Sequence, residues 1–331
     1  MPAGCISSAT KETLADPVQK CLKPRRSTTL QLPFRHDIWC KEWQVRVEVE
    51  SIPKEKRMAL VAKGRTWTAA AVLAMGMMTG TGIAEAAQCG NNAAGYNAWL
   101  QQTLKEAPSR GVGKAGLNAL AGTKYAQATI NADRNQKSFK LSFEDFMKKR
   151  GADTIIKRGR AQKQQNAALF AAIEKRYGVP AGPLIAIWGM ETGFGSYLGK
   201  QHTLSAVATL AYDCRRSDYF TGQLYAALKL IDQGDLSPQA VGAMHGEVGQ
   251  TQFMPANVLK YGVSGSGGSH FDLRNKADAL HSTANFLVGH GWQRGAGYQP
   301  GEPNYGAIQG WNAAQVYQRA IAVMGKAIDG N

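Results

Sequence analysis

The sequence predicts a mainly α-helical protein, because apolar residues recur at helical spacing in successive segments and strand-like runs are few. Glycine and proline divide these segments at positions where helices usually begin or end. We expect helices at 97–107, 161–177, about 180–192, 204–212, 219–231, 275–292 and 313–328. No internal repeat is present. The chain beyond its leader is about 245 residues long, which is enough for one sizeable domain or for a core with an extension.

The central helix carries a single carboxylate. Pro180 and Pro183 mark its start, since proline is tolerated only in the first turn of a helix. Apolar residues follow from Leu184 at helical spacing, and Glu191 lies on the same face. Gly193 then ends the helix. The pattern therefore predicts an acid that projects from a buried apolar stripe.

Such an acid is expected to have a raised pKa. Burial against Ile187 and Trp188 disfavours the charged form, and the negative end of the helix dipole acts in the same direction. A carboxylic acid that is still protonated near neutral pH suits general acid catalysis of glycosidic-bond cleavage. The alternative is a buried Glu191 that serves only as a structural hydrogen-bond partner.

Five segments in order resemble one family. They are IWGMETGFG (187–195), DCRRSDYF (213–220), GEVGQTQFMP (246–255), ANFLVGHGW (284–292) and GWN (310–312). Together they resemble the membrane-bound lytic transglycosylase B family, and the resemblance runs from about Phe139 to the C-terminus. It implies a lysozyme-like fold and cleavage of peptidoglycan. We therefore expect a lysozyme-like core at 161–331 behind an N-terminal helical extension at 88–160.

The resemblance also implies a mechanism with one acid. In that family a single glutamate, here Glu191, acts first as acid and then as base, and a 1,6-anhydro muramic acid end forms without water. The alternative is a hydrolytic muramidase of the same fold, with Glu247 as the second carboxylate. The glycines around Glu247 predict an exposed turn, which makes this second role the lesser option. An alternative from another class is a non-catalytic wall-binding protein.

The resemblance places further residues in the substrate cleft: Gln252, Arg215, Arg216, Asn312, Phe286 and Tyr317. The arginine pair suits lactyl or peptide carboxylates, because a guanidinium group binds a carboxylate through two parallel hydrogen bonds. Two positions depart from the family pattern. Ala243 stands where a serine is common, and Phe286 replaces a tyrosine that stacks on sugar.

No metal site and no cofactor are expected. Some members of the family carry a calcium-binding loop, but the corresponding stretch here is SGSGGSH (264–270), which lacks the acidic oxygen donors that calcium prefers. The histidines show no paired metal-binding spacing. GVGKAG (111–116) formally matches a dinucleotide-binding pattern, but no strand precedes it, so we interpret it as a loop.

Residues 58–87 have the features of a signal peptide: a basic start, a short uncharged apolar core and a small-residue cleavage pattern near Ala86–Ala87. Because such signals stand at the N-terminus, we expect translation to begin at Met58 and residues 1–57 to reflect a misplaced start. The alternative is a real N-terminal extension. We therefore expect a periplasmic protein.

Two cysteines, Cys89 and Cys214, follow the leader, and an exported protein with an even number of cysteines is expected to form a disulfide. Gln88 stands where lipoprotein processing needs a small residue, so no stable membrane anchor is predicted. The formal net charge of +15 suits an anionic polymer. Peptidoglycan glycan strands are the expected partner. Nucleic acid is not, since no zinc-finger or RNA-binding motif is present. We expect a monomer.

Overall fold

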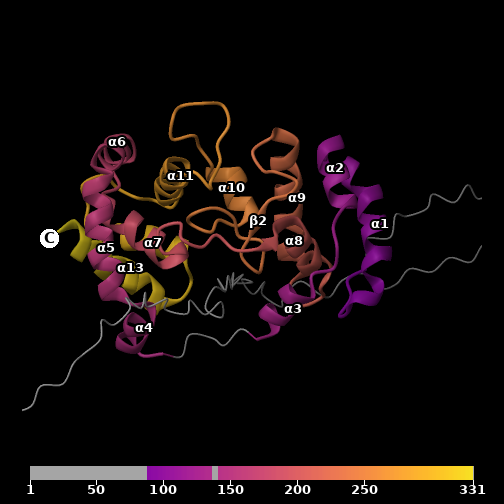
Figure 1. Ribbon diagram of the computed structural model, residues 1–331, viewed down its shortest axis with the longest axis horizontal. Coiled ribbons are helices and arrows are strands. Elements are labelled where there is room, and N and C mark those ends of the chain that lie inside the picture. The colour runs from indigo at the N-terminus through magenta and orange to yellow at the C-terminus, as the bar shows by residue number, and fades with distance from the viewer. Residues whose placement is uncertain (1–87, 136–140, 331) are drawn as a thin grey trace, which may run out of the picture. The chain divides into compact units, whose positions relative to one another are not determined.

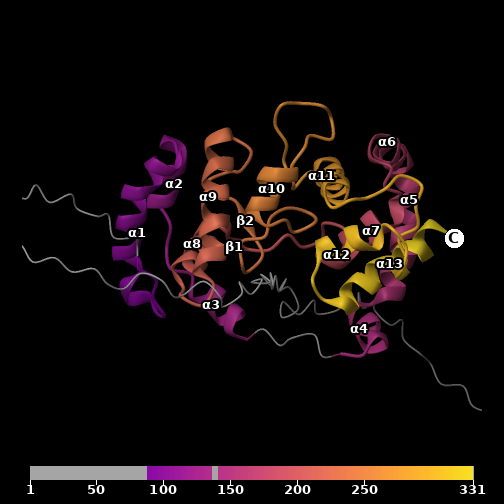
Figure 2. The same ribbon diagram turned by 180° about the vertical axis from the view of Figure 1, so that it is seen from behind.

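The computed structural model describes residues 88–135 and 141–330, and this part of the chain is mostly helical, as predicted (Figures 1 and 2). The predicted misplaced start (1–57) and signal peptide (58–87) lie outside the described residues. The α-helices are α1 (Tyr96–Glu106), α2 (Lys114–Ala121), α3 (Gln127–Arg134), α4 (Phe143–Arg150), α5 (Ala152–Gln165), α6 (Ala167–Tyr177), α7 (Ala181–Thr192), α8 (Thr203–Tyr212), α9 (Ser217–Gln233), α10 (Pro255–Tyr261), α11 (Lys276–Gly289), α12 (Tyr305–Trp311) and α13 (Gln315–Asp329). Short 3-10 helices lie at Ala93–Gly95 and Ala107–Arg110. Two short strands, β1 (Gln201–His202) and β2 (Val241–Gly242), pair antiparallel.

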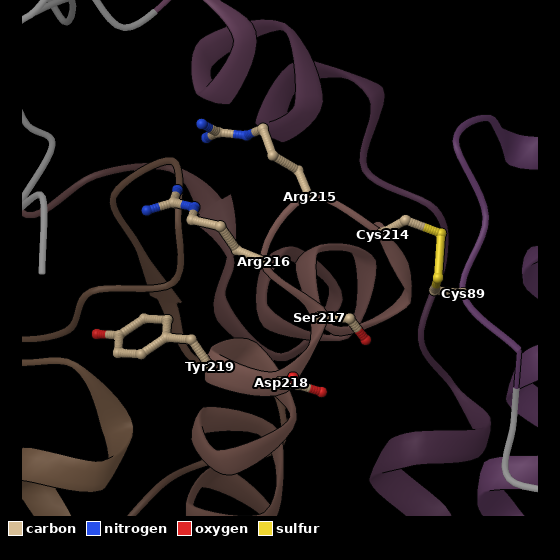
Figure 3. A pocket seen from close by; sticks show the side chains of 7 residues that line it. All are labelled: Cys89, Cys214, Arg215, Arg216, Ser217, Asp218 and Tyr219. Atoms are coloured by element: carbon tan, nitrogen blue, oxygen red, sulfur yellow. A yellow bond between two sulfur atoms is a disulfide. The ribbon is translucent and has the colours of Figure 1, made fainter. Parts of the chain in front are cut away.

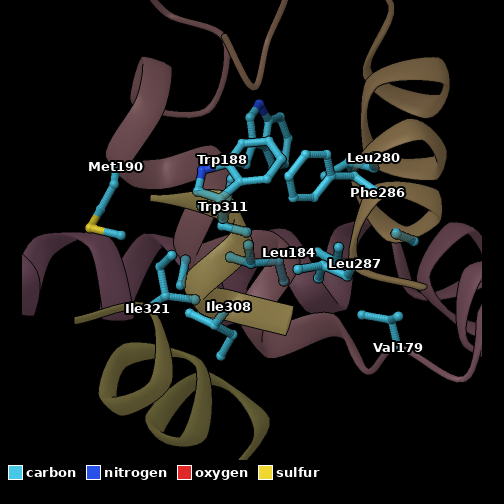
Figure 4. Packing of buried hydrophobic residues seen from close by; sticks show 14 of the residues in the cluster. Val179, Leu184, Trp188, Met190, Leu280, Phe286, Leu287, Ile308, Trp311 and Ile321 are labelled. Atoms are coloured by element: carbon cyan, nitrogen blue, oxygen red, sulfur yellow. The ribbon is translucent and has the colours of Figure 1, made fainter. Parts of the chain in front are cut away.

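Helix α7 is the centre of the larger apolar cluster. All of its residues are buried, including those opposite the predicted apolar stripe, because α5, α6, α11 and α13 pack around it. The contact with α13 is a close approach of two backbones. A Cβ atom at Gly182 would lie 2.2 Å from the carbonyl oxygen of Gly325. Figure 4 shows Leu184, Trp188 and Met190 of α7 among the side chains of this cluster.

The N-terminal extension packs on α8 and α9 through a second apolar cluster. Tyr96 and Trp99 of α1 contact Tyr212 at the end of α8, with ring centres 5.6 and 5.7 Å apart. Asp232 of α9 accepts hydrogen bonds from the backbone N–H groups of Gly113 (2.6 Å) and Gly116 (2.7 Å) at the start of α2. The prediction of a loop at 111–116 was therefore wrong in part, since a helix begins inside the segment and its N-terminus binds a carboxylate of the same chain.

Two helices replace the single one predicted at 161–177. Helix α5 begins at Ala152, before the expected start at residue 161, and ends at Gln165. Helix α6 begins at Ala167. Asn166 lies between them and donates its side-chain amide to the carbonyl oxygen of Gln162 at 2.9 Å. The expected division between extension and core, at residues 160 and 161, falls inside α5.

A disulfide joins Cys89 to Cys214, with the two Cα atoms 4.9 Å apart. Backbone hydrogen bonds lie on either side of it. Gly90 donates to Tyr212 (2.9 Å), and Cys214 donates to Gly90 (3.2 Å). The predicted disulfide is thus present, and it fixes the start of the described chain to the segment just before Arg215. Within the described residues, no helix is long and apolar enough to cross a membrane.

Candidate active site

Glu191 lies in the last turn of α7 and is 3 % exposed. Its Oε1 atom accepts two hydrogen bonds, one from the indole N–H of Trp311 at 3.0 Å and one from the hydroxyl group of Tyr317 at 2.9 Å. Trp311 ends α12 and Tyr317 lies in the first turn of α13. Helix α7 and the two consecutive helices α12 and α13, more than a hundred residues later, therefore meet at one carboxyl oxygen. The structure places the hydroxyl group of Tyr317 against Glu191, whereas the resemblance had assigned this tyrosine to the substrate cleft.

The turn between α12 and α13 positions both donors. Asn312 follows α12 with an extended backbone, and its side-chain oxygen accepts a hydrogen bond from the N–H of Ala314 at 2.9 Å. The side-chain amide of Gln318 donates to the carbonyl oxygen of Asn312 at 2.7 Å. Asn312 is buried, and these contacts fix the turn that separates Trp311 from Tyr317.

Tyr317 remains a hydrogen-bond donor. Burial raises the pKa of its hydroxyl group well above the ordinary value, and the nearby charge and hydrogen bond of Glu191 act in the same direction. Arg150, at the end of α4, stacks on the same ring, with Cζ 5.2 Å from the ring centre. Burial lowers the pKa of Arg150, opposed by the charges of Tyr317 and Glu191. Sequence reasoning missed this arginine, because Lys148 and Lys149 precede it in what resembles a solvated basic run.

The glycine-rich loop after β2 is attached to α7. The indole N–H of Trp188 donates to the side-chain oxygen of Gln250 (2.8 Å), and the hydroxyl group of Thr192 donates to its carbonyl oxygen (2.6 Å). Gln252 in this loop is buried and has a φ of 55°, a left-handed conformation that is uncommon outside glycine. Strained backbone of this kind concentrates at functional sites, which agrees with the cleft role expected for Gln252.

Arg215 and Arg216 both bind Asp133 of α3. The Nε–H of Arg215 donates to Oδ2 of Asp133 at 2.7 Å, and Arg216 binds Oδ1. Burial raises the pKa of Asp133, but hydrogen bonds and charge from the two arginines outweigh it and hold the pKa below its usual range. No sequence pattern had indicated a role for Asp133. The extension therefore contributes the acid that orients the predicted substrate-binding pair.

A pocket of about 600 Å³ lies beside these arginines (Figure 3). It is lined by Cys89, Cys214, Arg215, Arg216, Ser217, Asp218 and Tyr219. The disulfide forms one side of it and the guanidinium groups lie on the other. The predicted disulfide and the predicted substrate-binding arginines thus line the same pocket.

Glu247 is buried, so the prediction of an exposed turn was wrong. Its Oε2 atom accepts a hydrogen bond from the backbone N–H of His245 at 3.0 Å, and its Oε1 atom lies 3.5 Å from Nδ1 of the same histidine. Burial raises the pKa of Glu247, but the hydrogen bonds and charge of His245 outweigh it and hold the pKa below its usual range. The ring of His245 also lies 3.9 Å from Asp133. This histidine links the loop to the extension.

Phe286 lies in the aromatic core, 1 % exposed. Its ring contacts Trp311 with ring centres 5.0 Å apart, and Figure 4 shows the two side by side. It also stacks on His290 at 3.9 Å. Because the ring is buried and packed in this way, Phe286 supports Trp311 in place of the sugar contact that was expected.

The loop at 264–272 is closed by a carboxylate. Asp278 of α11 accepts hydrogen bonds from the backbone N–H groups of Gly265 (2.7 Å) and Asp272 (2.8 Å). Within the described residues, no group of three or more His, Cys, Asp or Glu side chains is arranged to hold a metal ion. Asp278 holds the two ends of the loop together through its own oxygens.

Comparison with known proteins decides the family. The family model described as "Transglycosylase SLT domain" matches residues 95–301. The chain belongs to this family. Membrane-bound lytic murein transglycosylase B of Escherichia coli (strain K12) is 38 % identical over 137 residues, which are 39 % of this chain and 38 % of that enzyme. The aligned stretch therefore spans well under half of the curated relative.

Solved structures agree with this assignment. SltB3 from Pseudomonas aeruginosa, in complex with NAG-NAM-pentapeptide, superposes with a TM-score of 0.66 at 25 % identity, covering 71 % of this chain and 80 % of SltB3. The Escherichia coli lytic transglycosylase Slt35, in complex with bulgecin A, gives a TM-score of 0.61 at 23 % identity over 73 % of this chain and 96 % of its own. The fold is thus that of lytic transglycosylases, as the sequence segments predicted.

Proposed function

We propose that this protein is a peptidoglycan lytic transglycosylase that cleaves the β-1,4 bond between MurNAc and GlcNAc and leaves a 1,6-anhydroMurNAc end. Membership of the transglycosylase family supports the reaction class. The observation that carries the proposal is the pair of hydrogen bonds from Trp311 and Tyr317 to Oε1 of Glu191. An oxygen that accepts two donors has both lone pairs in use, so the exchangeable proton of the acid form is carried by Oε2.

Glu191 serves as acid and then as base. Its Oε2–H donates a proton to the glycosidic oxygen as the bond from that oxygen to C1 of MurNAc breaks, and the carboxylate remains. The C6 hydroxyl of the same sugar then forms a bond to C1 and gives its proton to that carboxylate. The N-acetyl group of the sugar assists between the two steps. No water is consumed, and Glu191 returns to its protonated form.

The remaining predicted residues act around this centre. Gln252 binds sugar, and Arg215 and Arg216, oriented by Asp133, bind carboxylates of the lactyl or peptide groups. Peptidoglycan glycan strands are the partner, in keeping with the NAG-NAM-pentapeptide bound by SltB3. Asn312 fixes the turn that carries Trp311 and Tyr317, and Phe286 supports the indole of Trp311.

The location we propose is the periplasm, after removal of residues 58–87. The disulfide between Cys89 and Cys214 supports an oxidising compartment. The basic charge of the chain suits the anionic wall polymer, and we propose that the enzyme acts as a monomer.

The rival candidate is a hydrolytic muramidase in which Glu247 activates water. The burial of Glu247 and its two contacts with His245 favour a structural role instead. Replacement of each acid by glutamine separates the candidates when product release from purified peptidoglycan is measured. We expect Glu191→Gln to lose roughly 10³-fold or more of the rate and Glu247→Gln to keep the same anhydro products. Loss of chemistry in a folded Glu247→Gln variant would support the two-acid hydrolase.

A further inference from the structure

A partly buried cation lies against the ring of Tyr317, which binds the proposed acid. Arg150 is the last residue of α4, and its guanidinium carbon lies 5.2 Å from the ring centre of Phe146 and 5.2 Å from that of Tyr317. Its Nε atom is buried. A guanidinium group keeps its proton even when it is desolvated, so a full positive charge is held here between two aromatic faces.

Tyr317 connects this charge to the acid. One face of its ring carries the guanidinium of Arg150, and its hydroxyl group donates to Oε1 of Glu191. Two titratable groups are thus linked to Glu191, Tyr317 of α13 directly and Arg150 of α4 through the ring of Tyr317. On α5, Arg158 donates to the carbonyl oxygen of Gly193, two residues after Glu191, and stacks on Phe194. Burial lowers the pKa of Arg150, and the charges of Tyr317 and Glu191 oppose that effect.

We propose that Arg150 is the counter-charge of Glu191, a positioning residue that stabilises the carboxylate left when the acid has given its proton to the glycosidic oxygen. The assignment rests on the proposed function, since it requires Glu191 to be the acid. Burial and the apolar walls of the site penalise that carboxylate, and a cation fixed beside it offsets the penalty without contacting the sugar. Arg150 stays protonated throughout, and Glu191 alone exchanges the proton.

The pH dependence of the reaction tests this assignment. Activity falls at high pH when Glu191 loses its proton in the free enzyme, so this alkaline limb reports its ionisation. Removal of a nearby positive charge makes the carboxylate less favourable. We expect Arg150→Met and Arg150→Gln, in the full chain acting on peptidoglycan, to move the alkaline limb of kcat/KM upward by about 0.5 to 1 pH unit. Arg150→Lys is expected to restore most of the original profile.

Arg319→Met is the matched control. Arg319 of α13 stacks on Phe143 of α4, with Cζ 3.9 Å from the ring centre, so it is a stacked arginine between the same two helices. We expect its alkaline limb to stay where it is. An unshifted limb in a folded neutral variant of Arg150 would overturn the assignment, and so would unfolding of both neutral variants, which would make the arginine structural. If the unaltered chain releases no anhydro products at all, the proposed function fails, and the assignment fails with it.

Discussion

The hydroxyl group of Tyr317 and the indole N–H of Trp311 meet at the same oxygen of Glu191, at 2.9 and 3.0 Å. The acid lies on α7, and its two donors come from α12 and α13, more than a hundred residues later in the chain. In the mechanism that we propose, Oε1 accepts these two fixed donors and Oε2 carries the proton. The chemistry of the site thus depends on how α13 packs against α7.

Tyr317→Phe tests that division of roles. Loss of the hydroxyl group removes one of the two donors that stabilise the carboxylate, and we expect kcat to fall by about 10- to 100-fold. The same loss favours the protonated acid, so the alkaline limb of the pH profile should move upward. Initial rates of product release measure both effects. Tyr305→Phe is the control. This partly buried tyrosine is the first residue of α12, and its replacement should leave the rates unchanged.

The disulfide is expected to stabilise the fold. Its two cysteines are 125 residues apart, so reduction releases a long loop in the unfolded chain. The expected loss is about 2–5 kcal/mol of the free energy of unfolding. Denaturant melts of the oxidised protein and of a Cys89→Ser, Cys214→Ser variant measure it. Equal midpoints for the two proteins would show that backbone contacts at Gly90 suffice.

Glu247 predicts a dependence of stability on pH. Its folded pKa lies below the ordinary value, so the pairing with His245 contributes stability at pH values above the unfolded pKa of Glu, and this contribution is lost as the pH falls through the folded pKa. We expect the melting temperature of the unaltered protein to fall in that acidic window, and the fall to be smaller in Glu247→Gln. Parallel melting curves for the two proteins would contradict the structural role of the pair.

Asp278 is expected to stabilise its loop without a metal. Asp278→Ala leaves the N–H groups of Gly265 and Asp272 without their acceptor, and we expect a loss of about 1–3 kcal/mol. Asp153→Asn, at an exposed position in the first turn of α5, is the control. A chelator should leave the melting temperature of the unaltered protein where it is. A chelator-dependent fall would show that the loop binds a metal ion.

The sequence predicted the helical class and the acid because both depend on local patterns. Pro180, Gly193 and the apolar spacing between them delimit α7 and place Glu191 in its last turn. The partners of Glu191 could not be predicted in the same way. The contacts of Trp311 and Tyr317 depend on the crossing of α7 and α13 at Gly182 and Gly325, which no local pattern records.

Charged residues were the hardest to place. Arg150 ends a basic run and Glu247 stands among glycines, so both patterns favoured solvent exposure. The ring of Tyr317, from the distant helix α13, lies against the arginine, and His245, only two residues away in sequence, contacts Glu247. The pairing of Asp133 with Arg215 and Arg216, just before α9, spans some eighty residues. Contacts between residues this far apart in sequence determine which charged side chains are buried, and the periodicity of the sequence does not reveal them.

The mass of the muropeptides released from purified peptidoglycan tests the central claim most directly. We predict that the unaltered chain releases products whose MurNAc ends are one water lighter than hydrolytic products, and that Glu191→Gln releases none while it still binds the polymer. Products with reducing MurNAc ends would contradict the transglycosylase mechanism and would support the hydrolase in which Glu247 activates water. Retention of the polymer with no product from either protein would make this a wall-binding protein.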